Sequence, residues 1–237
     1  MKSVGDKINV DRGAWNFGGD VPLTFDDHVS KSVPLYHEGH DLICGLSDFF
    51  IKNDSVVYEI GSSTGVLTCK LACHNPTKFS ASFIGIDIEE NMTLFAKSNS
   101  ENLTNVNFIC DDILTFEIQE SDFIVAYYTV QFIRPSLRQE LINKIYQKLK
   151  WGGAFVLFEK VRGADARFQD ILTTLYNEYK IKQGYSPDDI WAKSQSLKGV
   201  LEPFSSQGNL DMLKRAGFVD INTIQKYLCF EGFLAIK

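Results

Sequence analysis

Short apolar runs alternate with longer stretches of helical periodicity through most of the chain. The apolar runs predict five strands, at residues 55–60, 82–87, 106–110, 122–128 and 154–159. The periodic stretches predict four helices, at residues 40–50, 65–74, 89–98 and 135–150. Strands that alternate with helices in this way form a parallel sheet with helices on both faces, so the pattern predicts an α/β fold.

Residues 162–205 interrupt this alternation. They contain two helical stretches, at residues 164–182 and 187–201. The Gly-Tyr-Ser sequence at 184–186 separates them, because glycine commonly ends a helix and serine commonly caps the next one. We therefore predict a helical insertion that covers the substrate side of the sheet or builds a dimer interface.

The chain closes with a helix at residues 210–216 and two strands at 219–224 and 227–236. The close spacing of these strands predicts an antiparallel hairpin. A length of 237 residues allows one α/β domain with a substantial core and an insertion. We therefore predict a single domain over residues 1–237.

The N-terminal segment, residues 1–35, shows no clear periodicity. Its aromatic residues, Trp15, Phe17 and Phe25, stand among glycines and aspartates. This apolar content is too high for a free tail. The segment is therefore predicted to be an irregular cap over a pocket or an interface.

The composition excludes several classes of protein. A net charge of −6 argues against a dedicated nucleic-acid binder, and no apolar run approaches the roughly 18 residues that span a bilayer. The polar N-terminus lacks the features of a signal peptide, and the five cysteines mostly lie in apolar segments, as in reduced proteins. Cys69, Cys73 and His74 have no second ligand cluster, so we predict no metal site. These features predict a cytoplasmic protein with no membrane or direct nucleic-acid partner.

The first predicted strand leads into a glycine turn. Glu59 stands near the end of this strand, and Gly61 and Gly65 enclose the turn before the next helix. The following strand ends in a second acidic residue, Asp87. Glycines let a ligand approach the backbone closely, and a carboxylate at the next strand end can accept hydrogen bonds from ribose hydroxyls. The arrangement predicts a nucleotide-type cofactor.

The spacing of the turn selects among such cofactors. It lacks the G-x-G-x-x-G pattern of dinucleotide sites and the Gly-Lys-Ser/Thr of phosphate-binding loops. Glu59 would repel a pyrophosphate but attract an ammonium group. Together with Asp87 and with Asp112 after a third strand, it predicts a class I S-adenosylmethionine site, and the terminal hairpin also fits that fold.

Each of these residues has a physical role in such a site. Glu59 would attract the methionine ammonium, Asp87 would hold the ribose hydroxyls, and Asp112 would accept from the adenine amino group. The cofactor would also meet the backbone of Gly61, Ser62, Ser63 and Ile113. The alternative for Asp87 and Asp112 is that they only cap helices.

Several segments resemble the carboxy-S-adenosylmethionine synthase family, over nearly the whole chain and most specifically between residues 129 and 159. These segments are residues 32–36, 129–132, 138–141, 144–146, 152–154, 159–160, 184–186, 214–218 and 235–237. The resemblance implies a class I methyltransferase, Rossmann-like fold with a seven-stranded sheet and an antiparallel last strand. It also implies cofactor contacts from Tyr36, Gly61, Ser62, Ser63, Asp87, Ile88, Asp112 and Ile113. Members of this family use prephenate to carboxylate the methyl group of S-adenosylmethionine, for the modification of a wobble uridine in tRNA.

The chain departs from this family at two positions. Tyr127 stands where the family has an asparagine, and Ser194 stands where it has the arginine that pairs with the new carboxylate. An arginine binds a carboxylate through two charge-assisted hydrogen bonds, which a serine hydroxyl cannot replace. Three nearby cations are candidates to compensate: Lys193, Lys198 and Arg162.

Because of Ser194, the sequence favours an S-adenosylmethionine-dependent methyltransferase that acts on a small molecule, with Tyr127, Tyr128 and His28 as catalytic candidates and Tyr127 also near the cofactor. The first alternative is carboxy-S-adenosylmethionine synthase. The second is a non-catalytic S-adenosylmethionine-binding subunit. We also predict a homodimer, formed through the N-terminal segment and the helical insertion.

Overall fold

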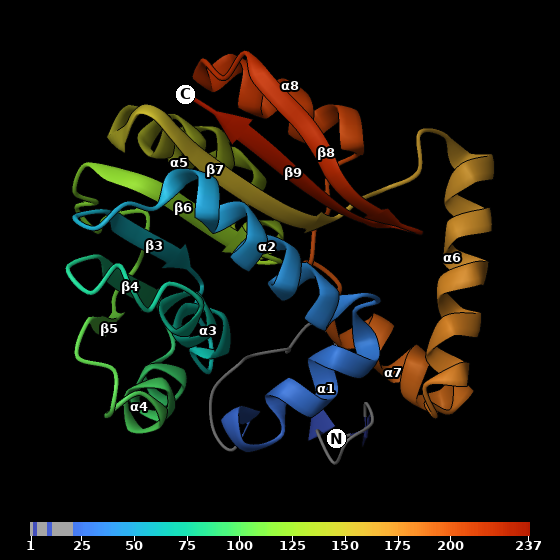
Figure 1. Cartoon of the computed structure of the whole chain (residues 1–237). Helices are drawn as coiled ribbons and strands as arrows, with labels where there is room; N and C mark the ends of the chain where they lie inside the picture. The colour runs from blue at the N-terminus through green and yellow to red at the C-terminus, as the bar shows by residue number, and fades with distance from the viewer. Residues whose placement is uncertain (1, 4–8, 11–20) are drawn as a thin grey trace.

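A seven-stranded sheet forms the centre of the computed structural model, which describes residues 2–3, 9–10 and 21–237 (Figure 1). The strand order is β5-β4-β3-β6-β7-β9-β8, and β9 alone runs antiparallel to its neighbours. The strands are β3 (Val56–Ile60), β4 (Ser82–Asp87), β5 (Val106–Cys110), β6 (Ser121–Tyr127), β7 (Leu149–Lys160), β8 (Asp220–Tyr227) and β9 (Phe230–Ile236). Two short strands, β1 (Lys2–Ser3) and β2 (Asn9–Val10), pair separately. The predicted α/β fold with an antiparallel last strand is confirmed.

Helices cover both faces of the sheet. The helices α5 (Pro135–Lys148) and α8 (Ser206–Ala216) pack on one face, and α2 (Tyr36–Phe50) and α3 (Val66–His74) pack on the other. The central strands are mostly apolar because both of their faces are buried. At one edge, α4 (Glu90–Asn99) packs against β4 and β5.

The remaining helices gather near the carboxyl ends of the parallel strands. These are α1 (Phe25–Ser32), α6 (Ala166–Lys182) and α7 (Pro187–Ser196), with short 3-10 turns η1 (Val21–Leu23) and η2 (Val130–Phe132). In Figure 1, α6 stands to the side of the sheet and α7 lies between its lower end and α1. The prediction of an irregular segment over residues 1–35 is therefore wrong for α1, while Trp15 and Phe17 lie outside the described residues.

Two predicted boundaries moved, and one predicted hinge is where the sequence places it. The strand expected at 154–159 begins at Leu149, because the Gly152 N–H donates to the Lys237 carbonyl at 2.7 Å and pairing with the chain end carries the strand through the glycines. The last helix begins at Ser206 rather than 210, since the Ser205 hydroxyl caps it. The predicted hinge at 184–186 is confirmed: Gly184 has a φ of 95°, and Ser186 forms a capping box with Asp189.

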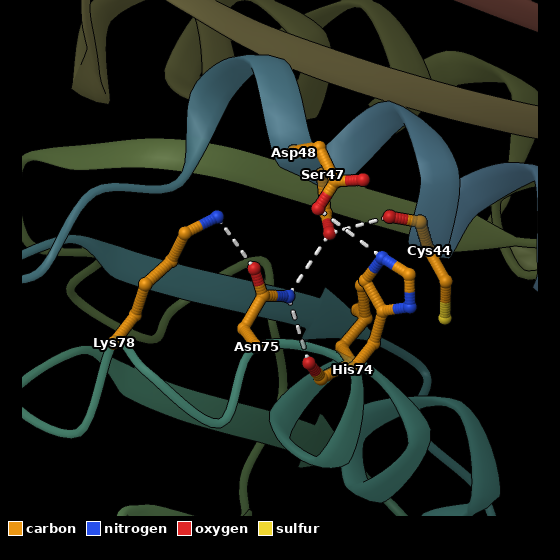
Figure 2. A network of polar contacts seen from close by, with 7 residues as sticks. Cys44, Ser47, Asp48, His74, Asn75 and Lys78 are labelled. Carbon is orange, nitrogen blue, oxygen red and sulfur yellow. Dashed lines mark hydrogen bonds and ion pairs between the residues drawn. The ribbon is translucent and has the colours of Figure 1, made fainter.

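A buried polar network fastens α2 to the end of α3 (Figure 2). The Asn75 amide donates to the Ser47 hydroxyl at 3.0 Å and to the Leu71 carbonyl at 2.9 Å, and the Lys78 ammonium donates to the Asn75 side-chain oxygen at 2.7 Å. The Ser47 hydroxyl in turn donates to the Cys44 carbonyl at 2.6 Å. This network fixes α2 relative to α3.

We predict that Asn75→Ala lowers the free energy of unfolding by about 1–3 kcal/mol, because it removes three hydrogen bonds and leaves buried partners unsatisfied. Chemical denaturation measures this change. The matched control is Asp48→Asn, which removes only the partly exposed ion pair with His74 and should cost at most about 1 kcal/mol. Equal losses in the two variants would contradict a structural role for the network.

Candidate functional site

All of the catalytic and cofactor-binding residues predicted from the sequence line one cavity of about 610 Å³. They are His28, Tyr36, Glu59, Gly61, Ser62, Ser63, Asp87, Ile88, Asp112, Ile113, Tyr127 and Tyr128. The cavity lies at the carboxyl ends of β3, β4 and β6, where ligands bind in open α/β sheets. Its volume is typical of a pocket for a small molecule or cofactor. The individual role of each residue stays a prediction.

The glycine turn after β3 is held by β4. The N–H groups of Gly61 and Ser62 both donate to the Ile86 carbonyl, at 2.7 and 3.0 Å. Gly61 has a φ of 71°, and a Cβ atom there would lie 2.3 Å from the Thr129 hydroxyl oxygen. The glycine is therefore required by backbone conformation and packing. Because these N–H groups are satisfied within the protein, they are not free to bind a pyrophosphate, which agrees with the choice of cofactor made from the sequence.

Asp87 ties the same turn to the next helix. Its two carboxylate oxygens accept the N–H of Ser63 at 2.7 Å and the N–H of Glu89 at 3.0 Å. Burial raises the pKa of this carboxyl group. A carboxylate has about four lone-pair positions, so each oxygen can accept one more hydrogen bond from a ribose hydroxyl. Asp87 thus serves the turn and still fits the predicted ligand.

Asp112 shows the capping role that the sequence left open. Its carboxylate accepts the N–H of Leu114 at 2.9 Å, and its other oxygen remains available to a ligand. Nearby, Ile88 lines the cavity although its apolar side chain is 65% exposed, while Ile113 is buried. An adenine ring placed here would cover the exposed side chain, so these residues fit the adenosine part of S-adenosylmethionine.

Glu59 lies deeper in the cavity wall and is 5% exposed. Its carboxyl group accepts a hydrogen bond from the Thr68 hydroxyl. Burial raises its pKa to about 8 from an ordinary value of 4.5. The unfolded chain therefore loses this proton near pH 4.5, whereas the free folded protein keeps it until about pH 8. As a result, the free energy of unfolding of the free protein falls as the pH rises from about 4.5 toward 8. A bound ammonium group would offset this cost, so Glu59 fits the methionine end of the cofactor.

Hydrogen bonds join α1, whose residues line the cavity, to two segments that are distant in the chain. The Thr64 hydroxyl donates to the Asp26 carboxylate at 2.8 Å, which joins the glycine turn to α1. The Tyr176 hydroxyl of α6 donates to the Ser32 carbonyl of α1 at 2.8 Å. Sequence reasoning missed Asp26 and Tyr176, because neither stands in a motif and their partners are far away in the chain.

The two tyrosines at the end of β6 have different surroundings. The Tyr127 hydroxyl donates to the Tyr36 carbonyl at 2.6 Å, and burial raises its pKa. The Tyr128 hydroxyl is buried and has no hydrogen-bond partner among the described residues. Tyr128 also has a φ of 59°, a left-handed conformation that is strained for a tyrosine. Tyr127 thus fastens the start of α2 to the end of β6. A catalytic role for either tyrosine stays a prediction.

The third catalytic candidate, His28, is almost completely buried in α1. Its ring lies beside the Tyr185 hydroxyl, 3.3 Å from Nδ1, and its other nitrogen contacts the Lys193 ammonium. Lys193 also donates to the Ser32 hydroxyl at 2.8 Å. The structure therefore joins α1 to α7 through His28, and a role in proton transfer stays a prediction.

The cations of the cavity differ from those expected. Lys193 lines it together with Ser194, whereas Arg162 and Lys198 do not, and the Arg162 side chain donates to the Pro203 carbonyl. Two lysines that sequence reasoning missed, Lys160 and Lys180, also line the cavity. Lys160 ends β7 and Lys180 lies near the end of α6, and only the fold brings both side chains to the cavity.

Within residues 2–3, 9–10 and 21–237, no group of three or more metal-binding side chains comes together. In the same part of the chain, no helix combines the length and the apolar character that a membrane span requires.

Residues 57–153 match the family described as methyltransferase domain. Solved structures share the fold: human N-acetylserotonin methyltransferase in complex with S-adenosylmethionine superposes with a TM-score of 0.64, at 18% identity over 92% of this chain and 56% of that one. The YcgJ protein of Bacillus subtilis has a TM-score of 0.59 at 16% identity, over 81% of this chain and 72% of that one.

Two curated relatives match almost the whole chain. The carboxy-S-adenosyl-L-methionine synthase of Staphylococcus epidermidis is 36% identical over 97% of this chain and 100% of its own length. The enzyme of the same name from Nautilia profundicola is 37% identical over 94% of each chain. With the fold and the cavity, these likenesses show that the chain is an S-adenosylmethionine-dependent transferase that binds this cofactor.

We predict that affinity for S-adenosylhomocysteine, which carries the same ammonium and is stable in mild alkali, rises about tenfold per pH unit from about pH 6 to about pH 8. The free protein holds a proton on Glu59 below pH 8 and must release it to pair with the ammonium. Calorimetry in buffers of different ionisation enthalpy measures both the affinity and the released proton.

Two variants make this test specific. Glu59→Gln should bind weakly and lose the pH dependence. Glu159→Gln is the matched control, because burial also raises the pKa of Glu159 to about 8 but this residue does not line the cavity. A pH dependence that survives in Glu59→Gln would rule out the proposed pairing.

Proposed function

Because the chain belongs to the carboxy-S-adenosyl-L-methionine synthase family, we propose that it carboxylates the methyl group of S-adenosylmethionine, with prephenate as the carboxyl donor. One observation of the site carries this proposal: beyond the cofactor residues, the cavity continues to the lysines Lys160, Lys180 and Lys193. A positively charged wall suits an acidic co-substrate better than a neutral methyl acceptor. The family resemblance supplies prephenate as the acid, and tRNA modification as the use of the product.

Bound S-adenosylmethionine supplies a methyl group whose hydrogens are acidified by the sulfonium, and in the proposed reaction this carbon exchanges a proton for a carboxyl group. Prephenate gives up that carboxyl group and its ring hydroxyl and becomes an aromatic 2-oxo acid. The hydroxyl leaves with the methyl proton as water, so the reaction needs no oxidant. The protein aligns the two reactants and excludes water, for which the buried tyrosines at the end of β6 are suited. No contact between this chain and tRNA is part of the proposal.

A second candidate function is methyl transfer to a small molecule, and Ser194 favours it. Ser194 lines the cavity, but its hydroxyl donates to the Trp191 carbonyl at 2.8 Å and carries no charge. The side chain that the resemblance assigns to the new carboxylate is therefore missing at this position. A non-catalytic role is not a candidate, since the chain is a transferase.

The mass of the reaction product distinguishes the two candidates. Incubated with S-adenosylmethionine and prephenate, the protein should release a cofactor in which a carboxyl group has replaced one methyl hydrogen. Ser194→Arg should lower the KM for prephenate by about tenfold, because a guanidinium can bind a carboxylate through two hydrogen bonds. Lys198→Arg is the matched control, since Lys198 is exposed and does not line the cavity.

Two results would contradict the first candidate. One is the absence of the carboxylated cofactor at saturating prephenate. The other is the release of S-adenosylhomocysteine with an added small molecule, which would establish the methyltransferase instead.

We also propose a homodimer that uses the helical insertion. The helix α6 exposes apolar residues at helical spacing, with Phe168, Ile171 and Leu175 each more than 40% exposed. The double variant Ile171→Glu, Leu175→Glu should halve the mass measured by light scattering. Thr173→Glu, on the opposite side of the helix, should leave the mass unchanged. A wild-type protein that is monomeric at micromolar concentration would overturn the proposal.

A further inference from the structure

Two lysine side chains converge on one aromatic ring in the cavity. Lys160 ends β7 and Lys180 lies near the end of α6. Their ammonium groups lie 4.4 and 4.5 Å from the centre of the Tyr176 ring. Tyr176 is itself fixed by its hydrogen bond to α1, so β7, α6 and α1 together hold this arrangement.

Neither lysine has an acidic partner in the described part of the chain. No ion pair joins Lys160 or Lys180 to a carboxylate there, although Lys180 is only 7% exposed. Burial and the neighbouring Lys160 lower the pKa of Lys180 to about 8. The contact with Tyr176 offsets part of the cost of burying two like charges, but an anion would offset much more.

An unsatisfied hydroxyl lies in the same corner of the cavity. The buried Tyr128 hydroxyl has no hydrogen-bond partner among the described residues. Phe230 connects the group: its ring centre is 5.8 Å from that of Tyr128, 5.1 Å from that of Tyr176 and 5.9 Å from the Lys160 ammonium. One aromatic cluster thus holds two cations that lack an acidic partner beside a hydroxyl that lacks a hydrogen-bond partner among the described residues.

We infer that Lys160, Lys180 and the Tyr128 hydroxyl form a binding site for a carboxylate group, which serves in place of the arginine that Ser194 replaces. A carboxylate can accept hydrogen bonds from all three donors. It removes the repulsion between the two ammonium groups and satisfies the buried hydroxyl. The carboxylate is that of the acid substrate or that of the finished cofactor, and this identification rests on the proposed function.

The site also explains why the serine is tolerated. An arginine at 194 would project from α7, whereas Lys160 and Lys180 reach the cavity from β7 and α6. Lysines bind a carboxylate as point charges rather than through a planar fork, so two of them together replace the charge and the number of donors.

The test compares ligands with and without a carboxylate at the reacting end. Isothermal calorimetry measures the binding of S-adenosylhomocysteine, carboxy-S-adenosylmethionine and prephenate to the full chain and to Lys160→Met, Lys180→Met and Tyr128→Phe. The lysine variants should bind S-adenosylhomocysteine as the wild type does and should lose about tenfold or more in affinity for a carboxylate ligand, with a smaller loss in Tyr128→Phe. Lys182→Met, an exposed lysine on the same helix, should change neither.

The comparison of prephenate with carboxy-S-adenosylmethionine identifies which molecule supplies the carboxylate. A loss confined to prephenate assigns the site to the substrate, and a loss confined to carboxy-S-adenosylmethionine assigns it to the product. The lysine variants should also be at least as stable as the wild type without ligand, because methionine removes an unpaired buried charge. Carboxylate affinities that remain unchanged in both lysine variants, or a large drop in the melting temperature of both, would overturn the inference.

The proposed function can fail independently. If the wild type binds prephenate through these lysines but makes no carboxylated cofactor, the function is wrong and the carboxylate site stands. If Lys160→Met and Lys180→Met make the carboxylated cofactor and bind both prephenate and carboxy-S-adenosylmethionine as tightly as the wild type does, the function stands and the site is wrong.

Discussion

The cofactor site depends on the way β4 satisfies the turn that follows β3. Three consecutive N–H groups, those of Gly61, Ser62 and Ser63, find their acceptors on the Ile86 carbonyl and the Asp87 carboxylate. This pairing is possible only because β3 and β4 are parallel neighbours in register, so that both strands end at the same edge. Without it, a buried turn would carry unsatisfied donors, each at a cost of about 1–3 kcal/mol. The same carboxylate remains able to bind ribose, so the constraint that builds the turn also prepares the site.

Charged residues of both signs line the cavity. Glu59, Asp87 and Asp112 are among its acidic residues, and Lys160, Lys180 and Lys193 are among its basic residues. In a buried cavity such charges act more strongly than they would in water. In the proposed function, the acidic residues bind the ammonium and the ribose hydroxyls of the cofactor, and the basic residues bind the acidic co-substrate.

Much of the fold could be predicted because it depends on local patterns. The apolar runs at β3, β4, β5 and β6 and the hinge at 184–186 are where the sequence places them, since strand burial and helix capping are decided by adjacent residues. The predictions that failed concern the start of β7 and the segment that forms α1, where contacts between residues distant in the chain decide the structure. Residues 149–153 extend β7 because the chain end pairs with them, and α1 forms where the spacing of apolar residues gives no clear signal.

The same division applies to function. The sequence by itself determined the cofactor, because Glu59, the glycine turn, Asp87 and Asp112 each stand at a strand end that parallel pairing must bring together. Through the family resemblance it also predicts that Ser194 stands in place of an arginine. Only the tertiary structure placed Lys160, Lys180 and Tyr128 around Tyr176 and Phe230, since these residues come from β7, α6, β6 and β9. Their meeting depends on how the helical insertion folds back over the sheet, and neither residue type nor spacing along the chain encodes that distance.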